Sequence, residues 1–132
     1  MNSFLCFLLI IALCLGSSNA VWEKNTVHFK NSLGPQNILK IHCVSNEDNL
    51  GFHYLSPGQT YDFSFHDSAL KTKFNCDLWQ GPDFRFHASF TAYEGKVIIV
   101  RYGRNVFWDA REEGIYRAED KETPKLMYSW TI

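Results

Sequence analysis

Alternation of apolar and polar residues with a period of two is the feature that most constrains the fold of this chain. In "NILKIHCV", Leu39, Ile41 and Cys43 fall on one side, whereas Lys40 and His42 fall on the other. Successive side chains of a β-strand point to opposite faces, so this pattern predicts a half-buried strand. The same alternation recurs in "TYDFSFH", "KFNCDLW" and "DFRFHASFT". The chain is therefore predicted to be all-β.

Turn signals separate these runs at short intervals. They occur in "SLGPQ", "SNEDNLG", "SPGQ", "QGPD", "YEGK" and "YGRN". Many short strands in a chain of this length favour two packed sheets, so we predict a small antiparallel β-sandwich of about eight strands. We also expect "TAYEGKVIIV" to form a tight hairpin with a positive φ at Gly95, and "VIIV" to be a strand covered on both faces.

Residues 1–20, "MNSFLCFLLIIALCLGSSNA", have the features of a secretory signal peptide. They contain no Lys, Arg, Asp or Glu, and their apolar run is shorter than the about 20 residues that a membrane-spanning helix needs. Ser18 and Ala20 occupy the −3 and −1 positions of a cleavage site. We predict cleavage between Ala20 and Val21, which leaves one secreted domain over residues 21–132. A buried N-terminal helix is the alternative.

Removal of the signal peptide leaves two cysteines. Cys6 and Cys14 depart with it, whereas Cys43 and Cys76 remain and lie on the apolar sides of their predicted strands. In an oxidising compartment two cysteines permit one intramolecular pairing. We therefore predict a Cys43–Cys76 disulfide, which would stabilise the fold by about 3–4 kcal/mol in the chain-entropy model. Free thiols or metal ligation are the alternatives.

The polar stretch around the first predicted cysteine does not fit a metal site. A calcium loop that starts at Asn46 would place Leu50 fifth and Pro57 twelfth, where oxygen ligands are required. His42 and Cys43 are adjacent on a strand and point to opposite faces, so they do not share a zinc ion. The stretch is predicted to be a turn, and we expect no metal and no cofactor.

The sequence lacks the common catalytic motifs. It contains no G-x-S-x-G, P-loop or H-E-x-x-H pattern. Four of the five histidines lie opposite the apolar side of their strands, which places them in solvent: His28, His42, His66 and His87. His53 lies between two aromatic residues, and its environment is left open. We predict no catalytic residue, although a secreted hydrolase or ribonuclease with two converging histidines is an alternative.

Two further observations concern binding partners. The net charge is −1, with 13 basic and 14 acidic residues, so no electrostatic attraction draws the protein to nucleic acid or to an anionic membrane. Trp79, beside "QGPD", and Trp108, in "NVFWDAREEGIY", could stack on sugars. A carbohydrate-binding module is therefore a further alternative, although tryptophan more often packs in a sandwich core.

The combined motifs resemble those of the plant self-incompatibility protein S1 family, also called S-protein homologues. The similarity covers "VHFKNSLGPQNILKIHCVSNEDNLGFHYLSPGQTYDFSF", "TKFNCDLW" and "FWDAREEGIY", nearly the whole predicted domain. The residues that match the family pattern are Leu39, His42, Cys43, Ser45, Leu50, Gly51, Leu55, Gly58, Tyr61, Phe63, Phe65, Phe74, Cys76, Trp108, Gly114, Ile115 and Tyr116. Asn49 stands where the family often has Asp. Typical members carry two further cysteines, which "YGRNVFW" and "KLMYSW" lack.

This resemblance implies a small secreted plant protein with a β-sandwich fold that acts as a ligand and not as an enzyme. Founding members meet a pollen membrane receptor, so the expected partner is a membrane receptor or another extracellular protein, bound by a monomer. Loops on a rigid sandwich carry recognition. The candidate recognition loops are Asn46–Asn49, Gln80–Asp83, Tyr102–Asn105 and Asp120–Lys125, and the residues singled out in them are Asn46, Glu47, Asp48, Asn49, Gln80, Asp83, Arg104 and Asn105.

Overall fold

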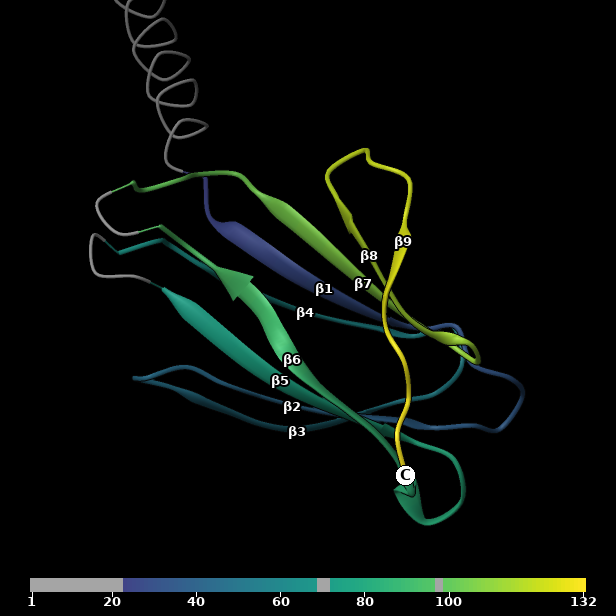
Figure 1. The fold of residues 1–132 in the computed structure, drawn as a ribbon. Coiled ribbons are helices and arrows are strands. Elements are labelled where there is room, and N and C mark those ends of the chain that lie inside the picture. The colour runs from purple at the N-terminus through teal and green to yellow at the C-terminus, as the bar shows by residue number, and fades with distance from the viewer. Residues whose placement is uncertain (1–22, 69–71, 97–98) are drawn as a thin grey trace, which may run out of the picture.

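A computed structural model describes residues 23–68, 72–96 and 99–132, and the predicted signal peptide and its cleavage position lie outside these ranges. The described chain forms nine strands and one short 3-10 turn (Figure 1). They are β1 (Asn25–Asn31), β2 (Leu39–Val44), β3 (Asn49–Leu55), β4 (Thr60–Phe65), β5 (Lys73–Gln80), η1 (Pro82–Phe84), β6 (Phe86–Glu94), β7 (Asn105–Arg111), β8 (Gly114–Glu119) and β9 (Lys125–Tyr128). No helix in these ranges has the length and apolar character needed to cross a bilayer.

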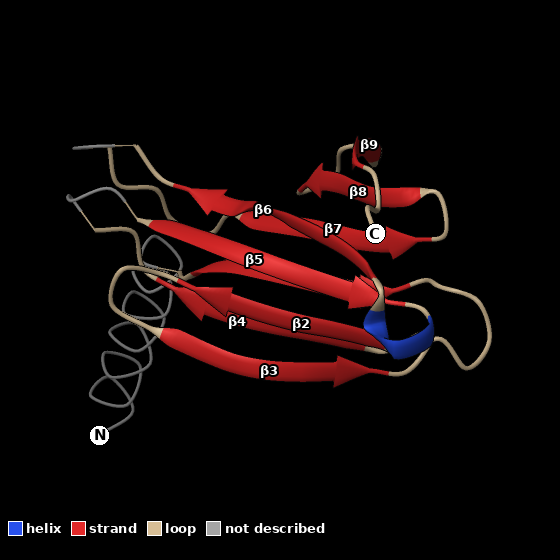
Figure 2. Cartoon of the chain, turned by 60° about the horizontal axis from the view of Figure 1, so that its bottom comes forward, coloured by secondary structure: helices blue, strands red, loops and turns tan. Residues whose placement is uncertain are grey.

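The strands form two sheets packed face to face. One sheet has the order β4-β1-β7-β8-β9 and the other has the order β3-β2-β5-β6, and Figure 2 shows the two layers. The predicted all-β sandwich is therefore confirmed. Neighbouring strands are antiparallel except β1 and β7, which pair in parallel. Alternation predicts which residues face inward but carries no information on strand direction, so this pair was not predicted.

The core lies between the sheets and consists of the alternate apolar residues of both. In β2, Leu39 and Ile41 are fully buried, as their alternation predicted. Trp108 of β7 is 3% exposed, and its indole N–H donates a hydrogen bond to the carbonyl of Ala92 at 3.0 Å. Burial of each large apolar side chain stabilises the fold by about 1.5–3 kcal/mol. Phe29 of β1, also fully buried, extends this core to the far sheet.

The two cysteines that remain in the predicted mature chain form a disulfide. Cys43 of β2 lies directly opposite Cys76 of β5, and the structure joins their sulfur atoms. Both side chains are buried, at 1% and 0% exposure. The bond therefore links two neighbouring strands of the same sheet on its core side.

The segment after β6 differs from the prediction. Gly95 does not have a positive φ, and its amide donates a hydrogen bond to the carbonyl of Thr72. In the part of "VIIV" that the structure describes, Ile99 and Val100 are outside any strand, and Ile99 is 52% exposed. The predicted positive φ at Gly95 is therefore wrong, and Ile99 and Val100 do not belong to the predicted covered strand, whose residues 97 and 98 lie outside the described ranges. The chain leaves the four-stranded sheet at Glu94 and crosses to the other sheet, which it enters at β7.

The loops gather at two opposite ends of the sandwich (Figure 1). The strand directions place the β2–β3 turn, the β6–β7 connection and the β8–β9 loop at one end, which we call the turn end. The β1–β2 loop, the β3–β4 turn and the β5–β6 loop lie at the other, which we call the hollow end. Recognition by loops can therefore use either end of the molecule.

Candidate recognition surfaces

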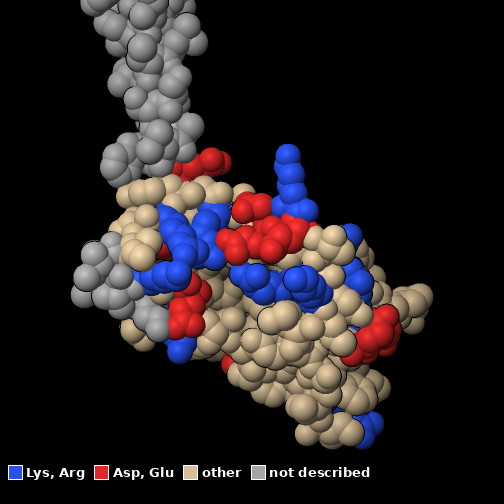
Figure 3. All heavy atoms as spheres, turned by 45° about the horizontal axis from the view of Figure 1, so that its top comes forward, with Lys and Arg blue, Asp and Glu red and all other residues tan. Residues whose placement is uncertain are grey.

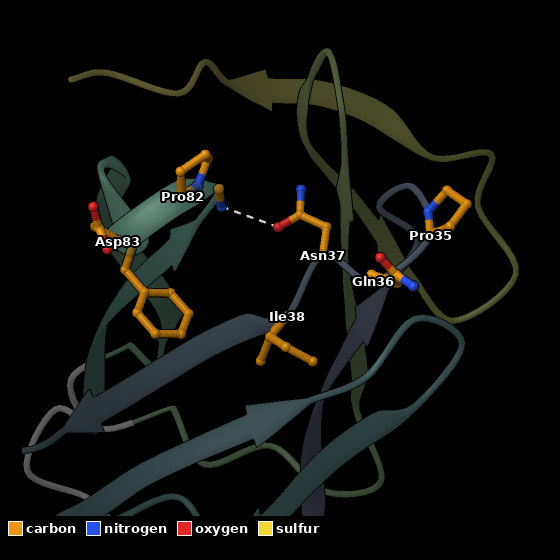
Figure 4. Close-up of a pocket in the computed structure, with 8 residues that line it drawn as sticks. Pro35, Gln36, Asn37, Ile38, Pro82 and Asp83 are labelled. Carbon is orange, nitrogen blue, oxygen red and sulfur yellow. Dashed lines mark hydrogen bonds between the residues drawn. The ribbon is translucent and has the colours of Figure 1, made fainter.

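Two loops at the hollow end meet and form a shallow, open hollow with a mostly apolar lining. One loop joins β1 to β2 and the other joins β5 to β6, and the hollow between them has a volume of about 690 Å³ (Figure 4). Its lining residues are Pro35, Gln36, Asn37, Ile38, Gly81, Pro82, Asp83 and Phe84. Because it is open to solvent on a broad side, it suits a protruding group of a large partner better than an enclosed small molecule.

Asn37 ties the two loops together. Its Oδ1 accepts a hydrogen bond from the Gly81 amide at 3.0 Å, and Figure 4 shows the carboxamide pointing across the hollow to that group. Its Nδ2 donates to Oε1 of Gln80 at 2.9 Å. These two bonds span the gap between segments that are more than 40 residues apart in sequence. The Asn37 side chain therefore links the β1–β2 loop to the β5–β6 loop across the hollow.

A second asparagine anchors this arrangement to the core. Asn31, the last residue of β1, is fully buried, and its Nδ2 donates to the carbonyls of Asn37 at 2.9 Å and Leu55 at 2.8 Å. Its Oδ1 accepts from the Leu33 amide at 2.9 Å. A buried carboxamide is tolerated when its donors and acceptor are paired in this way. The β1–β2 loop is consequently held against both sheets.

The backbone of the hollow is unusual. Of the four non-glycine residues with a positive φ in the described chain, three line it: Gln36, Asp83 and Phe84, with φ of 62°, 54° and 51°. Such left-handed conformations cost free energy for residues with a Cβ and concentrate at functional sites. Gly81 also has a positive φ of 84°, and a Cβ there would lie 2.5 Å from the Phe86 ring. The shape of the loop depends on these four backbone positions.

The predicted turn at Asn46–Asn49 is present and exposed at the turn end. Oγ of Ser45 accepts hydrogen bonds from the amides of Glu47 and Asp48, at 3.3 Å and 3.0 Å. Oδ1 of Asn49 is hydrogen-bonded to His42 at 2.8 Å and accepts from the Gly51 amide at 3.0 Å. The polar residues that suggested a metal site therefore shape a turn and hold it in place.

Two of the predicted recognition residues are supports and not surface contacts. Gln80 is 6% exposed and bonded to Asn37. The Arg104 side chain is 14% exposed, and its Nε donates to Glu119 at 2.6 Å. By contrast, Asp83 is exposed and lines the hollow. Asn105 is partly buried, and its Oδ1 lies 3.0 Å from Nε2 of His28.

The four predicted loops do not form one surface. Gln80–Asp83 lies at the hollow end, whereas Asn46–Asn49, Tyr102–Asn105 and Asp120–Lys125 lie at the turn end. Within the second group, Asp120 and Asn105 contact each other through a backbone hydrogen bond of 2.8 Å. No local sequence pattern indicates that Gln80–Asp83 contacts the β1–β2 loop, which is its partner in the fold.

A cluster of charged residues lies beside Tyr93 and Trp108. Glu119 accepts hydrogen bonds from Arg104 at 2.6 Å and Arg117 at 3.3 Å, and the bond from Arg104 lowers the pKa of Glu119. Burial, followed by a hydrogen bond to the Asp67 carboxylate, raises the pKa of Tyr93 to about 12. Figure 3 shows basic and acidic side chains interleaved on the upper part of the face in view. Arg104, Arg117 and Glu119 are thus paired with one another, although Nη1 of Arg104 is buried without a hydrogen-bond partner among the described residues.

The two tryptophans proposed for sugar stacking lie in different environments. Trp108 is buried in the core, so it is excluded as a surface residue. Trp79 is partly exposed on the outer face of the four-stranded sheet, where its ring stacks on His87 with a centroid separation of 5.1 Å. Only Trp79 of the two is available to a ligand.

The histidines are distributed over the molecule with separate partners. His28 contacts Asp62 and His87 contacts Asp77, each at 2.8 Å. His53 stacks on Tyr61 with a centroid separation of 3.8 Å. In the residues that the structure describes, no three His, Cys, Asp or Glu side chains are grouped so that they could hold a metal ion. His28 and His87 are therefore each paired with an acidic residue of their own, on different sheets.

Comparisons with known proteins agree on one family. A model of the family described as plant self-incompatibility protein S1 matches residues 26–130. The chain is 65% identical to S-protein homolog 9 of Arabidopsis thaliana, over 98% of this chain and 99% of that protein. It is 58% identical to S-protein homolog 8 of the same plant, over 98% and 99% respectively.

A solved structure has the same fold. It is a self-incompatibility protein homologue, from a widespread family of small, highly stable, secreted plant proteins. The TM-score is 0.69 and the sequence identity is 29%, with coverage of 83% of this chain and 96% of that chain.

Proposed function

Because this chain belongs to the plant self-incompatibility protein S1 family, we propose that it is a secreted, non-enzymatic ligand that binds a membrane receptor through the loops of its hollow end. The family is one of small secreted plant proteins, which supports an extracellular site of action. The observation that carries the proposal is the hollow between Pro35–Ile38 and Gly81–Phe84, with its three left-handed non-glycine residues.

Strained backbone persists only where the surrounding structure holds it, and here Asn37 and Asn31 do so. A hollow fixed in this way before binding loses little conformational entropy when a partner docks, which favours affinity. Its apolar lining beside an exposed carboxylate, Asp83, resembles the apolar centre and polar rim of protein interfaces. These properties support a protein partner with a protruding apolar side chain.

A membrane-binding experiment tests the proposal. The secreted protein, purified and labelled at one site, is titrated onto plant plasma-membrane vesicles. We expect saturable binding that unlabelled protein displaces and that protease treatment of the vesicles removes. Pro82→Arg places a charge in the hollow and should weaken binding about tenfold or more, because loss of one central contact often costs that much.

Pro57→Arg is the matched control, because Pro57 is an exposed proline in a neighbouring turn at the same end but does not line the hollow. It should bind as the wild type does. Binding that survives protease treatment, or a Pro82→Arg variant with wild-type affinity, would contradict the proposal. The purified protein should also leave RNA and oligosaccharides intact, and cleavage of either would favour the hydrolase alternative.

A further inference from the structure

The outer face of the four-stranded sheet carries an ordered set of aromatic rings around one lysine. The register places Tyr54 of β3, Lys40 of β2, Trp79 of β5 and His87 of β6 in one row across all four strands. Phe52 of β3 flanks this row. We call these five residues the aromatic face. It is separate from the loops proposed above to bind a receptor and meets them at Phe84, which lines the hollow and whose ring lies beside Lys40 and Tyr54.

The rings of this face are accessible and close enough to form one platform. Phe52 and Tyr54 are 54% and 57% exposed, which is unusual for large apolar side chains. The centroid of Phe52 lies 6.2 Å from that of Trp79, and Trp79 stacks on His87 at 5.1 Å. Neighbouring strands are about 4.8 Å apart, so rings on adjacent strands repeat at roughly the size of a sugar ring.

Lys40 sits without an acidic partner among three rings, two of the aromatic face and that of Phe84. Its Nζ lies 4.9 Å from the centroid of Phe52, 4.8 Å from that of Trp79 and 5.5 Å from that of Phe84. Among the ion pairs of the described residues, none includes Lys40. The rings hold the ammonium group in place by cation–π attraction. The face therefore presents a fixed positive charge whose hydrogen-bond donors have no carboxylate partner in the described part of the chain.

The polar side chains around the platform are also fixed. His87 is bonded to Asp77 at 2.8 Å, and His42 to Asn49 at 2.8 Å. Such pairs hold the side chains in defined positions and leave further acceptor and donor positions toward solvent. Rings interleaved with hydroxyl-binding groups match a ligand that is apolar on its ring faces and polar at its rim.

We propose that the aromatic face binds a glycan built of uronic-acid sugars, with pyranose rings packed on the exposed rings of Tyr54 and Phe52 beside Trp79 and a carboxylate paired with Lys40. The C–H faces of a pyranose carry partial positive charge and pack on the negative face of an aromatic ring. The carboxylate supplies the counter-charge that Lys40 lacks. A neutral glycan would pack on the rings but leave Lys40 without a counter-charge. An isolated anion would pair with Lys40 but leave the rings uncovered.

An acidic peptide is the competing ligand, and the topology disfavours it. Peptides that dock on sheets commonly add a strand to an exposed edge, where backbone groups are free. Lys40 and Trp79 lie on β2 and β5, the two inner strands of this sheet, whose backbone groups pair on both sides. A ligand on this face must be recognised by side chains alone, as a glycan is.

Four ligands of matched length distinguish these possibilities when the whole secreted protein is titrated calorimetrically. They are oligogalacturonate, its methyl ester, a neutral β-glucan oligomer and oligoglutamate. We expect oligogalacturonate to bind about tenfold more tightly than its methyl ester, because hydrogen bonds to charged groups are the stronger ones. Equal affinity for acid and ester, equal affinity for oligoglutamate, or no binding to oligogalacturonate would each overturn the proposal.

Variants locate the site. Lys40→Gln should lose the preference for the acid over the ester, and Tyr54→Ser should weaken binding of both, since Tyr54 is exposed and its removal leaves the core intact. The controls are Lys30→Gln, at an exposed lysine of β1, and Phe107→Ser, at an exposed ring of the other sheet, and both variants should bind normally.

Nuclear magnetic resonance gives a readout without mutation. The indole N–H signal of Trp79 should shift when the ligand is added, whereas the signal of buried Trp108 should stay unchanged. Wild-type binding by Lys40→Gln, or a titration that leaves the Trp79 signal unmoved, would overturn the assignment.

Discussion

At the scale of single residues, the hollow depends on Gly81 for two reasons. Its φ of 84° suits glycine, and the Phe86 ring occupies the space where a Cβ would lie. Gly58 has a similar φ of 88° but no heavy atom within 4 Å of an added Cβ. The two glycines therefore separate the cost of backbone strain from the cost of a steric clash.

We predict that Gly58→Ala lowers the free energy of unfolding by about 1–2 kcal/mol, the cost of a left-handed residue with a Cβ. Gly81→Ala should lower it further, because Phe86 must also move. Chemical denaturation of both variants measures the difference. Equal losses would mean that the Phe86 contact is relieved without cost, and a loss at Gly58 larger than that at Gly81 would contradict this account of the loop.

The charged cluster at Glu119 predicts a dependence of stability on pH. The hydrogen bond from Arg104 lowers the pKa of Glu119 below the ordinary value of a glutamate side chain. A carboxylate with a depressed pKa stabilises the folded state above its unfolded pKa, and this stabilisation is lost as the pH falls through the folded pKa.

Glu119→Gln should therefore be less stable than the wild type at neutral pH, by about 1–2 kcal/mol, the range for hydrogen bonds to charged groups. The difference should shrink as the pH falls below the ordinary pKa of a glutamate. Thermal unfolding at a series of pH values measures it, with Glu47→Gln, an exposed glutamate in the β2–β3 turn, as the control. A difference between wild type and Glu119→Gln that stays constant with pH would refute the assignment.

Residues of the hollow were only partly predictable from sequence. Asp83 lay in a recognisable turn, but the side chain that completes the site, Asn37, comes from a loop more than 40 residues earlier. Nothing in the local pattern of either loop indicates that they meet. Likewise, alternation placed Lys40 on the outer side of its strand but could not show that three rings surround it.

At the scale of elements, the alternation of period two predicted the strands well where one face meets the core. It failed for Ile99 and Val100, the described half of "VIIV", because an apolar run without alternation gives no face to assign. There the chain crosses between sheets, and Ile99 is exposed although its neighbours in sequence are apolar. Burial at such a crossing depends on the arrangement of the sheets and not on local pattern.

Removal of the Cys43–Cys76 disulfide, which links β2 to β5, should destabilise the fold. The bond closes a loop with a sequence separation of 33 residues, which corresponds to about 3–4 kcal/mol in the chain-entropy model. The double variant Cys43→Ala, Cys76→Ala should lose about that much free energy of unfolding, measured by denaturant titration. Reduction of the wild type should produce a similar loss. Unchanged stability in both experiments would show that the bond contributes nothing to the mature fold.

At the scale of the whole molecule, the sandwich is a rigid support with distinct surfaces. The turn end exposes the polar turn around Asn46–Asn49, the hollow end exposes the hollow, and the aromatic face lies on the side of one sheet. Binding at one of these surfaces leaves the others accessible. A receptor and a glycan could therefore be bound at the same time, provided that neither covers Phe84.

Hydrogen exchange of the wild-type protein, with and without receptor-bearing plasma-membrane vesicles, tests the central claim most directly. A ligand that docks through the hollow end as a rigid body should gain protection at the amides of residues 36–38 and 83–85. Exchange in the strands and in the exposed turn at Asn46–Asn49 should stay unchanged. Protection confined to the turn end, or spread through the strands of both sheets, would contradict recognition by the hollow.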